Sequence, residues 1–353
     1  MNSSELLNLR LFNQLLSTHN HKEPVEVVKY MCAMQSQALD LAKWAIGARL
    51  PESNNKDVTD ALNRGDIIRT HILRPTWHFV TAEDIYWMYE LSYPRLKLVY
   101  QSYAKMLKAD ETLLYSHLPY IENILIDGEH LTKQEIKNKL KNESFEFEDD
   151  QLSVLLSFAE LEGIVVNGRL AGNKQTYTLL EEWVPFKKKI TRDESLKRLA
   201  GKFFRSHGPA SLEDFVWWSG LTVTECRKAV EMIRPDFVCE MVNGRECWMA
   251  NDIKTPPSDN DSALLLAPFD EFLVSYKDRT EIFDSEHLRK IVTKNGIFSP
   301  TIMLNGKVIG TWKKITKKNG PDIILSFFGK VNKKVADLFE PERERLEKFY
   351  KDY

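Results

Sequence analysis

The chain has 353 residues, of which 43% are hydrophobic and 11% aromatic, which is too apolar for a disordered protein and too long for one compact core. No run approaches the roughly 18 to 20 uncharged apolar residues of a membrane-spanning helix. The first residues, MNSSELLNLR, lack the basic and apolar regions of a signal peptide. We therefore predict a multidomain cytoplasmic protein with no membrane partner.

Charge is balanced in total but segregated along the chain. The 49 Lys and Arg against 51 Asp and Glu give a net charge of -2, which is not typical of a nucleic-acid-binding protein. Basic residues nevertheless gather in residues 187–205 and 307–334, whereas residues 141–162 are acidic. Such runs are either solvated surfaces or a face for a polyanion, and charge alone favours the solvated surface.

The first of three similar modules covers residues 1–100. Apolar spacing predicts helices over residues 6–16, 23–50 and 57–64, and Pro51 ends the second of them. A β-prone stretch over residues 67–80 follows, and Pro75 breaks it as a hairpin turn does. Three helices followed by a hairpin are the order of a winged helix.

Two further modules repeat this order over residues 101–185 and 186–253. In the second module, a Thr132 to Glu135 capping box starts a helix. In both modules a turn pair, Asn167-Gly168 or Asn243-Gly244, indicates the hairpin. The predicted helices are 152–161, 196–207, 212–219 and 222–233, and the predicted strands are 164–166, 176–179, 237–241 and 246–249.

The composition changes near residue 254. Residues 254–261 have the prolines and serine of a linker, and short β-type segments then alternate with turns such as Asn305-Gly306. We expect a small antiparallel sheet or barrel, followed by a charged terminal helix over residues 333–350. The predicted fold class is α+β, with tandem winged-helix (helix-turn-helix) domains and an antiparallel, β-barrel-like C-terminal domain over residues 254–353.

Common metal and cofactor chemistry has no support in the sequence. The four cysteines show no C-x-x-C spacing, and the eight histidines show no ligand-like clustering. There is no Gly-rich phosphate loop, H-E-x-x-H, G-x-S-x-G or calcium-binding loop. We predict neither a metal nor a cofactor.

The segment Gln35-Ser36-Gln37 is unusual because it places two amides inside an apolar helical stretch. A buried amide costs free energy unless it is partnered. On a regular helix, residues two apart point about 200° away from each other, so both glutamines can face one pocket only if the helix is broken. Spacing alone favours exposed or locally bonded glutamines.

Five sequence blocks resemble those of the winged-helix DNA glycosylases of the AlkZ and YcaQ type. They are MQSQALDLAKWAIGARL (34–50), LRPTWHFVTAEDI (73–85), HGPASLEDFVWWSGL (207–221), LLAPFDEFLVSYKDR (265–279) and IFSPTIMLNGKVIGTW (297–312). The resemblance implies a catalytic motif of Gln, an aliphatic residue, then Gln or Asp. Gln35 and Gln37 match this motif, whereas Ser36 departs from its middle position.

The resemblance also implies DNA contacts. Arg74 and His78 lie in the block at the first wing, although Arg74 can equally be a surface charge and Trp77 core. Five lysines are candidate phosphate contacts: Lys187, Lys188, Lys189, Lys313 and Lys314.

Other residues of the matching blocks are expected to be structural. For Asp270, Tyr276, Asp278 and Arg279 we prefer a buried network in which Arg279 pairs with Asp270 or Asp278. Trp217 and Trp218 are expected to pack rather than stack on bases.

The leading hypothesis is a monomeric, metal-free DNA glycosylase that acts on double-stranded DNA carrying N7-alkylated or crosslinked purines and leaves an abasic site. In it Gln37 positions the attacking water and Gln35 assists. A winged-helix DNA-binding protein without catalysis, such as a regulator, and a protein-interaction module that does not touch DNA are the alternatives. Salt-insensitive, weak DNA binding would favour the last of these.

Overall fold

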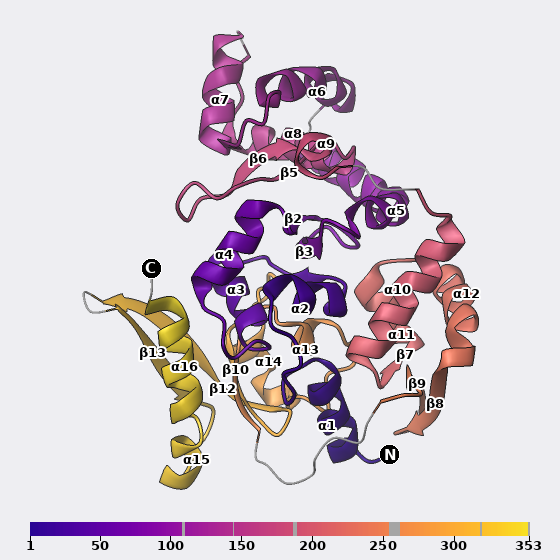
Figure 1. The fold of residues 1–353 in the computed structure, drawn as a ribbon, viewed down its shortest axis with the longest axis vertical. Helices are drawn as coiled ribbons and strands as arrows, with labels where there is room; N and C mark the ends of the chain where they lie inside the picture. The colour runs from indigo at the N-terminus through magenta and orange to yellow at the C-terminus, as the bar shows by residue number, and fades with distance from the viewer. Residues whose placement is uncertain (108–109, 144, 186–188, 254–261, 318–319, 352–353) are drawn as a thin grey trace. The chain divides into compact units, whose positions relative to one another are not determined.

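The computed structural model describes residues 1–107, 110–143, 145–185, 189–253, 262–317 and 320–351, and Figure 1 shows its elements. The predicted linker 254–261 lies outside these residues. The chain divides into two compact units. The first unit comprises Met1–Val58, Leu196–Trp218 and Thr222–Tyr353, and the second comprises Thr59–Ser195 and Ser219–Leu221.

The hairpin predicted at the end of each of the three modules is present. The first module contains α1 (Ser3–Asn13), α2 (Pro24–Met31), β1 (Met34–Gln35), α3 (Leu39–Gly47), α4 (Asn55–Arg64), β2 (Ile67–His71) and β3 (Trp77–Thr81). Strands β2 and β3 form the predicted antiparallel hairpin, from Ile67 opposite Thr81 to His71 opposite Trp77. The one helix predicted over residues 23–50 is wrong, because α2 and α3 are separated by a non-helical segment.

The second module contains helices that the sequence patterns did not indicate, the end of α5 (Ile85–Met106) and α6 (Glu111–Leu125). Both contain a proline, Pro94 and Pro119, a residue that commonly ends a helix. The module continues with β4 (Leu131–Thr132), α7 (Lys133–Asn142), α8 (Asp149–Leu161), β5 (Val165–Asn167), β6 (Thr176–Leu179) and α9 (Leu180–Trp183). Its sheet has the order β4-β6-β5.

Local signals set these boundaries. The Thr132 side chain accepts from the amide of Glu135, and the Glu135 carboxylate accepts from the amide of Thr132, so the predicted capping box is confirmed. Apolar side chains of α5, α6, α7 and α8 pack into one buried cluster with β4, β5 and β6, which includes Leu118, Ile136, Leu155 and Phe158. This cluster is the core of the second unit.

The third module repeats the order of the second, and most of it belongs to the first unit. It contains α10 (Arg192–His207), β7 (Ala210–Ser211), α11 (Leu212–Ser219), α12 (Val223–Ile233), the 3-10 turn η1 (Arg234–Asp236), β8 (Phe237–Val242) and β9 (Arg245–Ala250). The sheet order is β7-β9-β8. Asn243 and Gly244 at its tip both have positive φ, 49° and 79°, which is the backbone that an Asn-Gly hairpin turn requires.

The C-terminal part of the first unit contains an open sheet. Its elements are β10 (Ala263–Leu266), α13 (Glu271–Val274), η2 (Ser285–His287), α14 (Leu288–Ile291), β11 (Thr301–Leu304), β12 (Lys307–Lys317), β13 (Gly320–Phe327), α15 (Lys333–Asp337) and α16 (Glu340–Lys351). The strands are antiparallel in the order β10-β11-β12-β13. Among the described strands the two edges, β10 and β13, do not pair, so the alternative of a closed barrel is wrong. Helix α16 packs against both of these edge strands.

The single terminal helix predicted over residues 333–350 is also wrong, because it is two helices, α15 and α16, drawn in yellow in Figure 1. Pro341 is the second residue of α16. Proline is favoured in the first turn of a helix, where its missing N–H has no partner to lose, and it ends a helix that reaches it from before. Among the described residues, no helix is long and apolar enough to cross a membrane.

Candidate active site

The segment Gln35-Ser36-Gln37 is not helical. Helix α2 ends at Met31, and its cap residue Cys32 has a φ of 71°. The chain then runs extended through Met34 and Gln35 before α3 begins at Leu39. The helical geometry that would turn the two glutamines away from each other is therefore absent. The Gln35 residue is 6% exposed and Ser36 is fully buried, whereas Gln37 is exposed.

The backbone of Gln35 is held by a buried carboxylate from a distant part of the chain. Its amide donates to Oε1 of Glu271 at 2.6 Å. The other oxygen of Glu271 accepts from Trp218 Nε1 at 2.9 Å and from Ser275 Oγ at 2.6 Å. His207 Nε2 lies 3.5 Å from that same oxygen. Glu271 is thus fixed on both sides, and it fixes the peptide that begins the glutamine segment.

The residue before Glu271 anchors the other end of α3. Asp270 receives two hydrogen bonds from Arg49, at 2.8 and 2.9 Å, and both side chains of this ion pair are fully buried. Arg49 also donates to Oε1 of Gln14, and Gln14 Nε2 donates to the Tyr276 hydroxyl. Two adjacent carboxylates, Asp270 and Glu271, therefore hold the chain on either side of α3.

Of the buried network predicted for this block, Asp270 and Tyr276 are buried, whereas Asp278 is not, and the predicted pairs are wrong. Arg279 pairs with neither Asp270 nor Asp278: its Nε donates to the Leu273 carbonyl at 2.6 Å. Asp278 pairs instead with Arg245 at 2.8 Å. The sequence offered several arginines, and only the fold decides which one is close enough to each carboxylate.

The two tryptophans of α11 have different environments. Trp218 is fully buried and bonds to Glu271, as expected of a packing residue. Trp217 is 43% exposed, donates to the Val274 carbonyl, and lies against the guanidinium of Arg279 at 5.3 Å.

Burial shifts the titration of groups in this region. The pKa of His207 is lowered, first by its burial, against the opposing effect of Glu271. Burial also lowers the pKa of Lys43 in α3 to about 8; the nearby Lys314 lowers it further and Asp40 raises it. The neutral form of His207 is therefore favoured at neutral pH.

The C-terminal sheet reaches the start of α3 through a lysine. Lys314 on β12 pairs with Asp40 at 2.5 Å, and its ammonium lies 3.8 Å from the centre of the Tyr350 ring. The Tyr350 hydroxyl donates to the carbonyl of Asp40 at 2.9 Å. Lys313, the preceding residue, is exposed. Of these two predicted phosphate contacts, Lys314 already has a structural partner.

The remaining predicted DNA contacts fall in the second unit. His78 is fully buried on β3, with Nδ1 2.8 Å from the Thr76 carbonyl oxygen, and Arg74 is half-buried in the loop between β2 and β3. Lys189 is exposed and pairs with Glu90 at 2.9 Å. Lys187 and Lys188 lie outside the described residues.

Trp77, expected in the core, is half-buried, with Arg69 4.1 Å from its ring centre.

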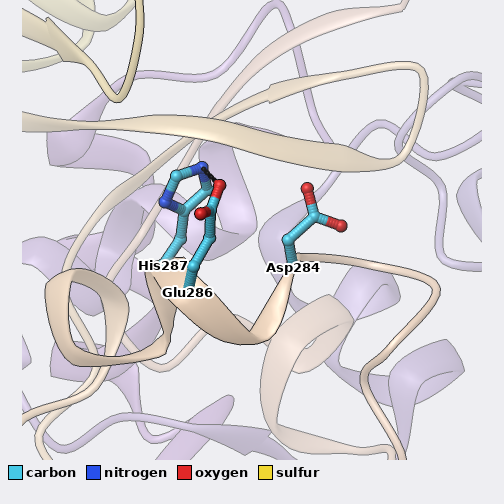
Figure 2. A group of neighbouring side chains, drawn as sticks. All are labelled: Asp284, Glu286 and His287. Atoms are coloured by element: carbon cyan, nitrogen blue, oxygen red, sulfur yellow. Dashed lines mark ion pairs between the residues drawn. The ribbon is translucent and has the colours of Figure 1, made fainter.

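Among the described residues, one group could supply three ligands to a metal ion: Asp284, Glu286 and His287. Figure 2 shows the Glu286 carboxylate directed at His287, with which it forms an ion pair at 3.4 Å, while the Asp284 carboxylate stands to one side. Asp284 and Glu286 are exposed, as acidic surface groups commonly are.

Glu271 is the residue of this site that sequence reasoning missed. It stands beside Asp270 within an otherwise apolar block, LLAPFDEFLV, between Phe269 and Phe272. Asp and Glu are almost never fully buried unless they are paired, so two adjacent carboxylates in an apolar block indicate partnered groups, and this was the available signal.

Comparisons with known proteins agree with one another. The family model described as "DNA glycosylase AlkZ-like" matches residues 28–349. A curated protein of Streptomyces sahachiroi, "Interstrand DNA cross-link repair glycosylase", is 24% identical over 337 residues, covering 88% of this chain and 87% of that protein. The solved structure of Streptomyces sahachiroi DNA glycosylase AlkZ matches with a TM-score of 0.81 and 19% identity, covering 99% of this chain and 96% of that one.

Proposed function

The chain belongs to the AlkZ-like family of DNA glycosylases, enzymes that hydrolyse N-glycosyl bonds, and we propose that its substrates are N7-alkylated or crosslinked purines in double-stranded DNA. The family resemblance seen in the sequence is thereby confirmed. The observation that carries the proposal is the break between α2 and α3, which releases Gln35 and Gln37 from a helix and leaves Gln37 exposed.

Hydrolysis of the glycosidic bond of an N7-alkylated purine requires the protein mainly to position the attacking water. A purine alkylated at N7 is already cationic, so it leaves without a strong general acid, and the sugar develops positive charge as the bond breaks. A neutral amide is no base, but its carbonyl oxygen accepts a hydrogen bond from water and directs it at C1′. In this proposal Gln37 positions the water and Gln35 assists.

The middle residue of the motif is consistent with this role. Ser36 is fully buried between a buried Gln35 and an exposed Gln37. Burial explains why an aliphatic residue suits this position, and a serine is small enough to occupy the same space. We infer that Ser36 changes the packing beneath the segment and leaves the placement of Gln35 and Gln37 unchanged.

The fold suits an open DNA-binding surface. We propose that residues 1–100, 101–185 and 186–253 are winged helices, because each repeats the order of helices and a hairpin, and that residues 254–353 form the β-rich domain that supports the first of them. Crosslinked adducts are too bulky for the closed pocket of a base-flipping enzyme, so an open cleft fits them better.

The proposed phosphate contacts differ in how exposed they are and in whether they already have an ion-pair partner. Lys313 is exposed and can meet a phosphate directly, and Lys189 can exchange its exposed partner Glu90 for one. Lys314 would have to break its ion pair with Asp40 to bind a phosphate. Arg74 and His78 are proposed to shape the surface near the first wing, and Lys187 and Lys188 to extend it. We propose that the protein acts as a monomer in the cytoplasm, where it meets its DNA.

A single-turnover excision assay tests the proposal. A duplex with one N7-methylguanine is incubated with excess protein, abasic sites are cleaved with alkali, and spontaneous depurination is subtracted. Replacing Gln37 by Ala should slow excision by at least ~100-fold, the usual contribution of a residue that orients a reacting water, with DNA affinity unchanged.

The matched control is Gln134→Ala, an exposed glutamine on α7 whose partner is Asn138. It should excise at the native rate. Equal rates for Gln37→Ala and the native chain would remove Gln37 from the reaction. A native chain that releases nothing, from this duplex or from one with an interstrand crosslink, would contradict the proposed substrates.

A further inference from the structure

The glutamine segment follows the end of helix α2. Because α2 ends at Met31 and Cys32 is its cap residue, the peptide N–H groups that follow have no acceptor within that helix, and a buried N–H without an acceptor is costly. The amide of Ala33 turns back to the carbonyl of Met31. For the amide of Gln35 the acceptor is Glu271, which is 236 residues away in sequence.

The backbone conformation of the two residues before Glu271 directs its side chain toward Gln35. Phe269 is largely buried and has a φ of 59°, a left-handed conformation that is strained for a residue with a side chain. Asp270 then caps α13 through the amide of Phe272, so the next residue begins a short helix. This turn lets Asp270 and Glu271 reach Arg49 and Gln35, on opposite sides of α3.

The carboxylate itself has little freedom. Glu271 is 1% exposed, one oxygen is used by Gln35, and the other is shared by Trp218 and Ser275. Hydrogen bonds to a charged acceptor are about twice as strong as neutral ones. A group held by donors on both oxygens cannot rotate without breaking several of them at once.

We propose that Glu271 is a positioning residue for the reaction: it fixes the peptide of Gln35 and, through it, the placement of the Gln35 and Gln37 side chains. The inference rests on the proposed function. Glu271 acts on the backbone and does not touch the substrate. A displacement of about 1 Å at a reacting group can cost ~100-fold in rate, so loss of this bond should affect catalysis more than DNA binding.

The principal variant is Glu271→Asp, which keeps the charge but is one methylene shorter, so its carboxylate withdraws from the Gln35 amide. A role for charge alone would survive this change, whereas positioning would not. The single-turnover rate on the N7-methylguanine duplex should fall at least 10-fold, with the dissociation constant for the same duplex within about 3-fold of native.

The matched control is Glu160→Gln. Glu160 is equally buried, and it pairs with His71 within the second unit at 2.5 Å. Neutralising it tests whether any disturbed buried carboxylate slows excision. Its rate should stay near native, and a fall as large as that of Glu271→Asp would overturn the inference.

A second readout does not depend on activity. Hydrogen–deuterium exchange of a peptide covering residues 33–38 should be at least 10-fold faster in Glu271→Asp than in the native chain, while peptides from α8 keep their native rates. Unchanged exchange at 33–38 would overturn the inference. If the native chain excises nothing but exchange accelerates as expected, the fault lies in the proposed function and not in the contact. If Gln37→Ala abolishes excision and Glu271→Asp leaves it at the native rate, the positioning role is wrong and the proposed function stands.

Discussion

The buried pair of Arg49 and Asp270 allows a sharp test of how the first unit is held together. Replacing Asp270 by Asn keeps the shape and the cap on Phe272 but leaves the guanidinium of Arg49 buried without its counter-charge. Both side chains of the pair are fully buried and their atoms are 2.8 Å apart. Removing one partner of such a pair costs about 3–5 kcal/mol.

A second pair in the same unit is the control. Arg245 and Asp278 are also 2.8 Å apart, but their side chains are 37% and 40% exposed. Asn at position 278 should cost about 0–1 kcal/mol, because exposed pairs contribute little. The two substitutions are chemically identical and differ in burial.

Equilibrium urea unfolding followed by tryptophan fluorescence measures the difference. With an m-value of about 2 kcal/mol per M, Asp270→Asn should lower the midpoint by about 1.5–2.5 M and Asp278→Asn by less than about 0.5 M. Equal shifts for the two variants would refute the reasoning, since burial would then not govern the strength of these pairs.

Other predictions concern packing and pH. Gly47→Ala should destabilise the protein by about 1–3 kcal/mol, because a Cβ there would lie 2.5 Å from the Phe349 ring. Gly201→Ala, on α10, where a Cβ would lie 4.0 Å from Ile233, should stabilise it by about 0.5–1 kcal/mol, and urea midpoints of the two glycine variants that move in the same direction would contradict this. The pKa of Lys43 falls from 10.5 to about 8 on folding, so the unfolded chain holds more protons between these values and stability should rise with pH from about 8 to 9.5. Lys43→Met should flatten that rise in urea midpoints, and an unchanged slope would exclude Lys43 as its source. The pKa of His207 is lowered by burial, so the unfolded chain takes up a proton as pH falls below 6.5 and stability should be lost there. His207→Gln should lessen this loss between pH 6.5 and 5.5, and an equally steep fall would count against the burial of a neutral imidazole.

Much of the fold was predictable because it depends on neighbours in sequence. The capping box of Thr132 with Glu135 and the turn at Asn243-Gly244 act over two to four residues, and both are as predicted. Helix periodicity likewise located α4, α8 and α10 within a few residues. In these elements local propensity and tertiary packing agree.

The break at the glutamine segment was not predictable in the same way. Residues 31–38 contain neither glycine nor proline, so nothing local ends the helix. The break is stabilised instead by Glu271, together with the bond from Trp44 Nε1 to the Leu265 carbonyl at 2.5 Å. Contacts across more than 200 residues override a helical preference worth at most a few kcal/mol.

The partners of charged residues were likewise not predictable from the sequence. Lys314 was a candidate phosphate contact, and in the fold it pairs with Asp40. Asp270 and Arg49 are 221 residues apart and nothing in their spacing connects them. The identity of the candidate site was visible from the resemblance of its blocks, whereas its supporting contacts required the structure.

The most direct test of the central claim is the detection of the released base. A duplex with one N7-methylguanine, and a second with an interstrand crosslink, are incubated with the native chain and with Gln37→Ala, and free purine adducts are measured by mass spectrometry. The account predicts adduct release with an equal number of abasic sites for the native chain, and release at the spontaneous rate for the variant. Tight binding of both duplexes by the native chain without release of either adduct would contradict it.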